Sequence, residues 1–67
     1  MQPHQQRVVD EKTALDEKIS KLTPFLAGPI YQGLDAAERI RLRAQLAVMR
    51  EYSDILTERI KHFAEAA

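Results

Sequence analysis

Apolar residues in the first third of the chain repeat with the spacing of an α-helix. They follow one another at intervals of seven, four, three and four residues, and they are Val8, Leu15, Ile19, Leu22 and Leu26. This spacing puts all of them on one helix face. Pro3 is suited to the start of a helix. We therefore expect a first helix over residues 4–22.

Residues 23–34 are expected to interrupt the helical pattern. They contain both glycines and two of the three prolines, which makes a continuous helix through them improbable. Thr23 as N-cap and Pro24 at the first helical position would start one short turn within this connector. Its apolar side chains are expected to plug the end of a helix pair, with a ligand site as the alternative. They are Phe25, Leu26, Ile30 and Tyr31.

The remaining pattern predicts a long helix over residues 36–64. Asp35, followed three residues later by Glu38, resembles a capping box. Spacings of four and three then define a seam similar to that of a coiled coil, with Ser53 as its one polar member. The seam comprises Leu42, Leu46, Met49, Ser53, Leu56, Ile60 and Phe63. A second stripe beside it comprises Val48, Tyr52, Ile55 and Arg59.

The two predicted helices differ in length and in apolar surface. At 1.5 Å per residue the first would measure about 28 Å and the second about 43 Å. A chain of 67 residues has a thin core, and without cysteine it has no disulfide to support that core. We therefore expect a single all-α domain over residues 1–67, an antiparallel helical hairpin that assembles into a homo-oligomeric helical bundle.

Charge and composition exclude several classes of partner. Lys plus Arg and Asp plus Glu each number 10, so no net charge attracts the chain to DNA, RNA or an anionic membrane. No signal peptide and no apolar run long enough to span a bilayer is evident in the sequence. We expect a cytosolic protein.

Catalytic and metal-binding patterns are also missing from the sequence. Ser53 and His62 are nine residues apart and would face opposite ways on one helix, so they cannot form a nucleophile and base pair within a chain. His4 and His62 lack the spacing of zinc ligands. We expect no enzyme activity, no metal and no cofactor.

Three arginines of the long helix form a basic stripe. Arg39, Arg43 and Arg50 lie within about 40° of one another around the helix axis. Cations near a helix N-terminus oppose the helix dipole, so this stripe calls for an anionic neighbour. The first candidate is the acidic side of the first helix, and the second is a ligand that carries phosphate. The acidic residues are Asp10, Glu11, Asp16 and Glu17.

Three stretches resemble a known family. They are HQQRVV at 4–9, LDEKISKL at 15–22 and RLRAQLAVMREYSDILTERI at 41–60. The chain resembles the small phage proteins known as crAss-phage-related helical proteins, which include the anti-CBASS cyclic-nucleotide sponges. The resemblance implies a phage protein that acts in the host bacterial cytoplasm. It would bind cyclic oligonucleotides and withhold them from CBASS effectors without cleaving them.

The resemblance also implies an assembly and a set of ligand-binding residues. Sponges of this kind form hexamers with separate sites for cyclic dinucleotides, such as cGAMP, and for cyclic trinucleotides, such as cyclic triadenylate. The phosphate-binding lysine falls on Lys18, with Ser20 as a nearby hydroxyl donor, and the arginine of the trinucleotide site falls on Arg59. His62, one turn beyond Arg59, could share that surface. His4 stands where the family has a stacking tyrosine, which affects dinucleotide binding more than trinucleotide binding.

Helix geometry limits how these residues can cooperate. His4 and Lys18 are about 21 Å apart along the first helix, so one chain cannot place both on one small ligand. Two antiparallel copies related by a two-fold axis could do so. The alternative function is a helical interaction module whose seam binds a partner protein and no small ligand.

Overall fold

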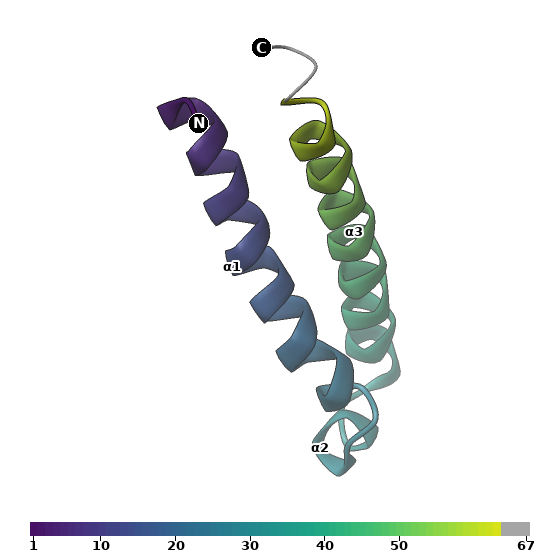
Figure 1. Ribbon diagram of the computed structural model, residues 1–67. Coiled ribbons are helices and arrows are strands. Elements are labelled where there is room, and N and C mark those ends of the chain that lie inside the picture. The colour runs from purple at the N-terminus through teal and green to yellow at the C-terminus, as the bar shows by residue number, and fades with distance from the viewer. Residues whose placement is uncertain (64–67) are drawn as a thin grey trace.

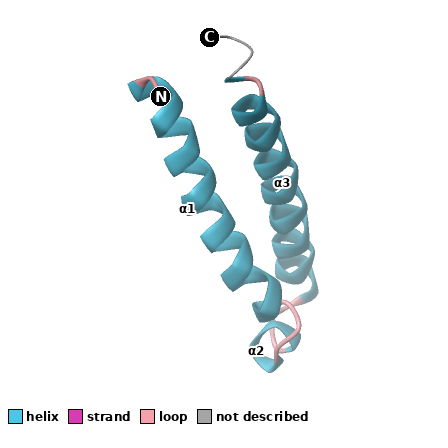
Figure 2. Ribbon diagram, viewed as in Figure 1, coloured by secondary structure: helices cyan, strands magenta, loops and turns pink. Residues whose placement is uncertain are grey.

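The protein is a hairpin of two long helices joined by a short one. The computed structural model describes residues 1–63, and its elements are α1 (Pro3–Phe25), α2 (Pro29–Gln32) and α3 (Ala36–Lys61). Helices α1 and α3 run antiparallel, with α2 at the closed end and the N-terminus at the opposite end (Figure 1). The molecule measures 50 × 15 × 14 Å. Residues 1–63 contain helices and turns but no strand, which confirms the all-α prediction (Figure 2).

The core is the seam between α1 and α3. Val8, Leu15 and Leu56 are its buried residues, and the apolar side chains that pack against them are Ile19, Met49, Ile60 and Phe63. Leu46 and Ser53 are also buried on the same face of α3. The seam predicted from the spacing of four and three is therefore confirmed. No helix within residues 1–63 has the length and apolar character required to cross a membrane.

Helix α1 extends beyond the predicted end at residue 22. It includes Pro24, and the Leu26 N–H still donates to the Leu22 carbonyl at 3.2 Å. The Thr23 hydroxyl donates to the carbonyl of Ile19 within the helix and does not cap a new one. The prediction of a helix start at Thr23 and Pro24 was wrong. Because Pro24 lies in the last turn, its missing N–H removes only one late hydrogen bond of the helix.

The connector turns at its glycines and packs one aromatic side chain inward. The short helix α2 begins at Pro29, after Gly28 in extended conformation. Tyr31 is 1% exposed and plugs the closed end of the hairpin, as predicted. Phe25 and Leu26 are partly buried, whereas Ile30 is 69% exposed, so its inclusion in the plug was wrong.

Helix α3 begins at the predicted residue without the predicted cap. Asp35 occupies the N-cap position, but its side chain accepts no capping hydrogen bond. Glu38 does not reach back to Asp35, because its carboxylate pairs with Arg41 Nε at 2.8 Å. The helix ends at Lys61, and the predicted end at residue 64 lies outside the described residues.

The apolar surface left over on α3 lies along its side. Helix α1 has 23 residues and α3 has 26, which correspond to about 34 Å and 39 Å. The difference in length between the two helices is therefore smaller than predicted. Four large apolar side chains of α3 nevertheless remain exposed. They are Ile40, Val48, Tyr52 and Ile55, which we call the exposed stripe.

Candidate ligand-binding surfaces

Lys18 lines a groove between the two long helices. The groove has a volume of about 470 Å³, and its lining residues are Lys18, Lys21, Leu22, Phe25, Gln45 and Met49. Small-molecule sites in proteins commonly have about 300–1,000 Å³. Two lysines beside aromatic and aliphatic side chains provide cations for phosphate and apolar surface for a base or sugar. We call this the lysine groove.

Arg59 and His62 lie together in a second groove near the end of α3. This groove has about 460 Å³ and is lined by Asp54, Ile55, Glu58, Arg59 and His62. The structure thus brings together two of the predicted ligand-binding residues. All five residues belong to the last turns of α3 or to its C-cap, so a single chain provides only one wall. We call this the arginine groove.

The other two predicted ligand-binding residues line neither groove. His4 is exposed in the first turn of α1. Ser20 is exposed, and its hydroxyl donates to the Glu17 carbonyl at 2.7 Å. Since α1 is one continuous helix from Pro3 to Phe25, His4 and Lys18 are far apart within the chain. Their cooperation on one ligand would need two copies.

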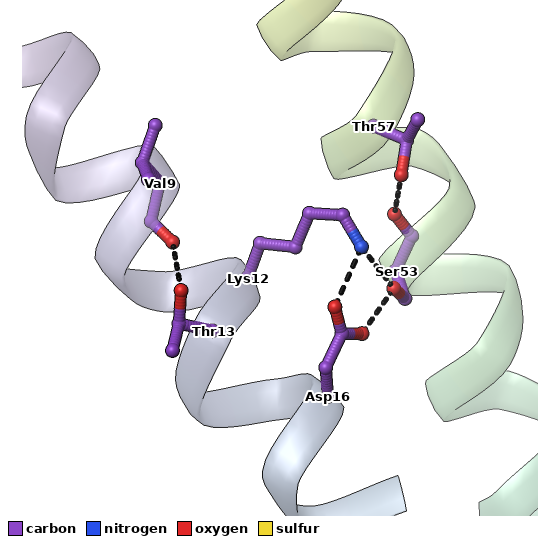
Figure 3. A network of polar contacts seen from close by, with 6 residues as sticks. All are labelled: Val9, Lys12, Thr13, Asp16, Ser53 and Thr57. Carbon is purple, nitrogen blue, oxygen red and sulfur yellow. Dashed lines mark hydrogen bonds and ion pairs between the residues drawn. The ribbon is translucent and has the colours of Figure 1, made fainter.

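A polar cluster in the seam was not expected from the spacing of residues. Lys12 Nζ lies 2.7 Å from Asp16 Oδ2 and donates to Ser53 Oγ at 3.0 Å, and Ser53 Oγ donates to Asp16 Oδ1 at 2.5 Å (Figure 3). The hydrogen bond from Lys12, and to a smaller extent the one from Ser53, lowers the pKa of Asp16, whereas burial raises it.

The chemistry of this cluster indicates a structural role. Lys12 donates to Ser53 as an ammonium group paired with Asp16, and an ammonium has no lone pair with which to accept the hydroxyl proton. The cluster therefore joins α1 to α3. The sequence identified Ser53 as the polar member of the seam, but its partners depend on the register of the two helices.

The arginine stripe divides into two parts in the structure. Arg50 donates from Nη2 to the Thr23 hydroxyl at 3.4 Å, which links α3 to α1. Arg39 and Arg43 line a smaller pocket beside Tyr31 at the closed end. Among residues 1–63, no cluster of three or more His, Cys, Asp or Glu side chains is placed to hold a metal ion.

Comparison with known proteins relates most of the chain to a described family. A family model described as Sequestin matches residues 2–62. This range includes all three helices and all residues of both grooves. No match was found among curated proteins or among solved structures.

Proposed function

This chain belongs to the Sequestin family, and we propose that it binds and sequesters cyclic oligonucleotides without cleaving them. The name of the family indicates a sequestering function and does not specify a ligand. The ligand class comes from the resemblance of three sequence stretches to the anti-CBASS sponges. In this proposal the protein acts in the cytoplasm of a phage-infected bacterium and keeps immune messengers from their effectors.

The observation that carries the proposal is the pair of separate grooves, one with the predicted phosphate-binding lysine and the other with the predicted arginine of the trinucleotide site. Lys18 lies in the groove of about 470 Å³ and Arg59 in the groove of about 460 Å³. The lining of both grooves is mainly apolar, as stacking of a base requires, and each includes a long cationic side chain for contact with a phosphate. Sequestration requires such contacts and needs no nucleophile, general base or metal.

Assembly would complete the grooves. The arginine groove has one wall, supplied by α3, so a second copy would provide the other. Two antiparallel copies would bring His4 of one chain near Lys18 of the next, in keeping with the two-fold symmetry of a cyclic dinucleotide. Three copies around Arg59 would match a cyclic trinucleotide. A hexamer contains both kinds of axis, and the exposed stripe offers apolar surface for its contacts.

Charge substitutions in the two grooves test the proposal. Lys18→Ala should abolish binding of cyclic dinucleotides, and Arg59→Ala should abolish binding of cyclic trinucleotides, measured by isothermal titration calorimetry. Arg41→Ala is the matched control, because Arg41 lies outside both grooves and pairs with Glu38. Circular dichroism should show unchanged helicity. Loss of assembly in both groove variants would instead identify Lys18 and Arg59 as interface residues and contradict the proposal.

The exposed stripe favours a second candidate function, a helical module that binds a partner protein. Three of its side chains, Ile40, Val48 and Ile55, are each more than half exposed. Large exposed apolar patches on a monomer often mark interaction sites. In that case substitutions in the stripe would remove partner binding, whereas Lys18→Ala and Arg59→Ala would leave it unchanged. Val48 is the stripe position that separates the two functions, because it lies outside both grooves whereas Ile55 also lines the arginine groove.

A further inference from the structure

A third pocket lies at the closed end of the hairpin, where α2 meets the first turns of α3. It has a volume of about 210 Å³ and is lined by Tyr31, Ala36, Arg39, Ile40 and Arg43. None of these residues lines the lysine groove or the arginine groove. We call it the turn pocket.

Two arginines line this pocket, and neither forms an ion pair within residues 1–63. Arg39 Nε is buried and has no hydrogen-bond partner among the described residues. The guanidinium carbon of Arg43 lies 5.7 Å from the centre of the Tyr31 ring, within the range of a cation–π contact. The two arginines are one helical turn apart, so their charges repel each other. A buried donor with no acceptor also destabilises the fold.

The acidic residues of α1 do not neutralise this pair. Asp16 lies at the level of Ser53, to which it is hydrogen-bonded, and Ser53 is ten residues from Arg43, or about 15 Å along α3. That distance exceeds the Debye length of about 8–10 Å at physiological salt. The antiparallel order of the helices therefore keeps the carboxylates of α1 away from the turn pocket.

The nearest carboxylate in the sequence is also engaged elsewhere. Glu38, in the first turn of α3, pairs with Arg41. Within residues 1–63 the cations that form ion pairs are Lys12, Arg41, Lys61 and, when protonated, His62. The first candidate for the anionic neighbour of the stripe, acidic α1, was wrong. Arg39 and Arg43 form no ion pair among the described residues, and Arg50 donates to the Thr23 hydroxyl and not to a carboxylate.

We propose that the turn pocket binds the phosphate group of a phosphomonoester. A phosphomonoester carries about −1.5 to −2 charges at pH 7, which matches two guanidinium groups. Arginine is suited to this role, because its planar fork can donate two parallel hydrogen bonds to phosphate oxygens. The volume of about 210 Å³ is below the usual range of about 300–1,000 Å³ for whole ligands, so the pocket takes the phosphate and leaves the rest of the molecule outside.

The ionisation of the ligand distinguishes this site from the two grooves. Each phosphate of a cyclic oligonucleotide is a diester with a single negative charge, whereas a monoester is close to a dianion above its second pKa of about 6. The Tyr31 hydroxyl donates to the Arg39 carbonyl at 3.3 Å, and this hydrogen bond joins the tyrosine to the backbone of α3 beside the pocket. The site stands on these contacts alone and does not depend on the proposed sequestration of cyclic oligonucleotides.

Nuclear magnetic resonance of the full-length ¹⁵N-labelled protein tests the proposal. The probes are inorganic phosphate, adenosine 5′-monophosphate and dimethyl phosphate, each titrated at pH 7.5. Inorganic phosphate should shift the Arg39 Nε–H signal and the amide signals of residues 36–43 in a saturable manner. Adenosine 5′-monophosphate should shift the same signals, and any tighter binding would measure what the nucleoside adds. Dimethyl phosphate should bind at least about tenfold more weakly, because it carries one negative charge where a phosphomonoester carries nearly two.

Matched arginine variants identify the residues responsible. Arg39→Ala and Arg43→Ala should each weaken phosphate binding about tenfold or more. Arg7→Ala removes the same charge at an exposed position of α1 outside the turn pocket and should leave binding within twofold. Arg43→Lys keeps the charge of an exposed residue and should lose part of the affinity, so the test remains decisive even if Arg39→Ala unfolds. Absence of a saturable shift at Arg39 with inorganic phosphate would overturn the proposal. An Arg43→Ala protein that binds phosphate as tightly as the unmodified protein would also overturn it. Phosphate binding here without any cyclic-oligonucleotide binding would support this site and contradict only the proposed function.

Discussion

Ser53 of α3 donates a hydrogen bond of 2.5 Å to Asp16 of α1, and this contact lies within an otherwise apolar seam. Lys12 approaches both groups and completes the cluster (Figure 3). Apolar packing tolerates sliding of one helix along another more readily than a directional polar contact does. The cluster therefore fixes the register of α1 and α3, and with it the level at which each groove residue lies.

Replacement of Ser53 by alanine should destabilise the hairpin by about 0.5–1.5 kcal/mol, because Lys12 and Asp16 lose their shared partner on α3. Urea denaturation at a fixed protein concentration would measure the change. Thr57→Ala is the control, since the Thr57 hydroxyl donates to the Ser53 carbonyl within α3 and does not join the helices. Equal effects of the two substitutions would contradict the role of Ser53 as a link between helices.

The Asp16 contact should make stability depend on acidic pH. Lys12 and Ser53 lower the pKa of Asp16 in the folded protein below its ordinary value of 3.8. The contact therefore contributes fully above that ordinary value and is lost as the pH falls through the lower pKa of the folded state. Asp16 is 47% exposed, so solvent screening limits the effect to less than about 1 kcal/mol.

Urea denaturation between about pH 5 and pH 2 would detect this dependence. The Asp16→Asn variant should show a smaller loss of stability on acidification than the unmodified protein. Glu51→Gln removes an exposed carboxylate outside the contact and should follow the unmodified protein. An Asp16→Asn protein with an unchanged pH profile would show that other carboxylates account for the whole dependence.

Two adjacent residues of α3 should respond very differently to truncation. Leu56 is 0% exposed and Ile55 is 57% exposed. Leu56→Ala should cost about 2–5 kcal/mol of unfolding free energy through the lost contacts and the cavity left behind. At a protein concentration where the chain is monomeric, Ile55→Ala should cost less than about 0.5 kcal/mol. Comparable losses for both would mean that the exposed stripe is buried under those conditions.

The exposed stripe should hold copies of the chain together. Val48→Lys and Ile55→Lys place a charge in the apolar surface, and each should shift the protein toward the monomer in sedimentation velocity experiments. Their helicity should be retained, because neither side chain contributes to the α1–α3 seam. Gln6→Lys adds the same charge at an exposed position of α1 and should leave the assembly intact. Assembly that survives both stripe variants would contradict this role.

The periodic part of the fold could be predicted from the sequence. The spacing of apolar residues identified both long helices and the buried positions of α3, including Leu46 and Leu56. The ends of the helices could not be predicted equally well. The sequence predicts a helix start at Pro24 and a capping box that includes Glu38, whereas Pro24 lies inside the last turn of α1 and Glu38 pairs with Arg41.

The grooves could be predicted only in part, because they depend on contacts between elements. Arg59 and His62 line the same groove, as their spacing of three residues on one helix predicts. The structure places Lys18 with Met49 and Gln45, which only the hairpin register brings near. The arginine stripe was visible in the sequence, but its division between Thr23 and Tyr31 depends on the connector.

Native mass spectrometry tests the central claim of sequestration most directly. The purified protein would be measured alone and with a panel of cyclic di- and trinucleotides, and the bound ligand would then be recovered by denaturation and its mass determined. The account predicts a symmetric oligomer that retains cyclic oligonucleotides and releases them intact, with uptake of dinucleotides lost in Lys18→Ala and uptake of trinucleotides lost in Arg59→Ala. An oligomer or monomer that takes up none of these ligands, or that returns them as linear products, would contradict it.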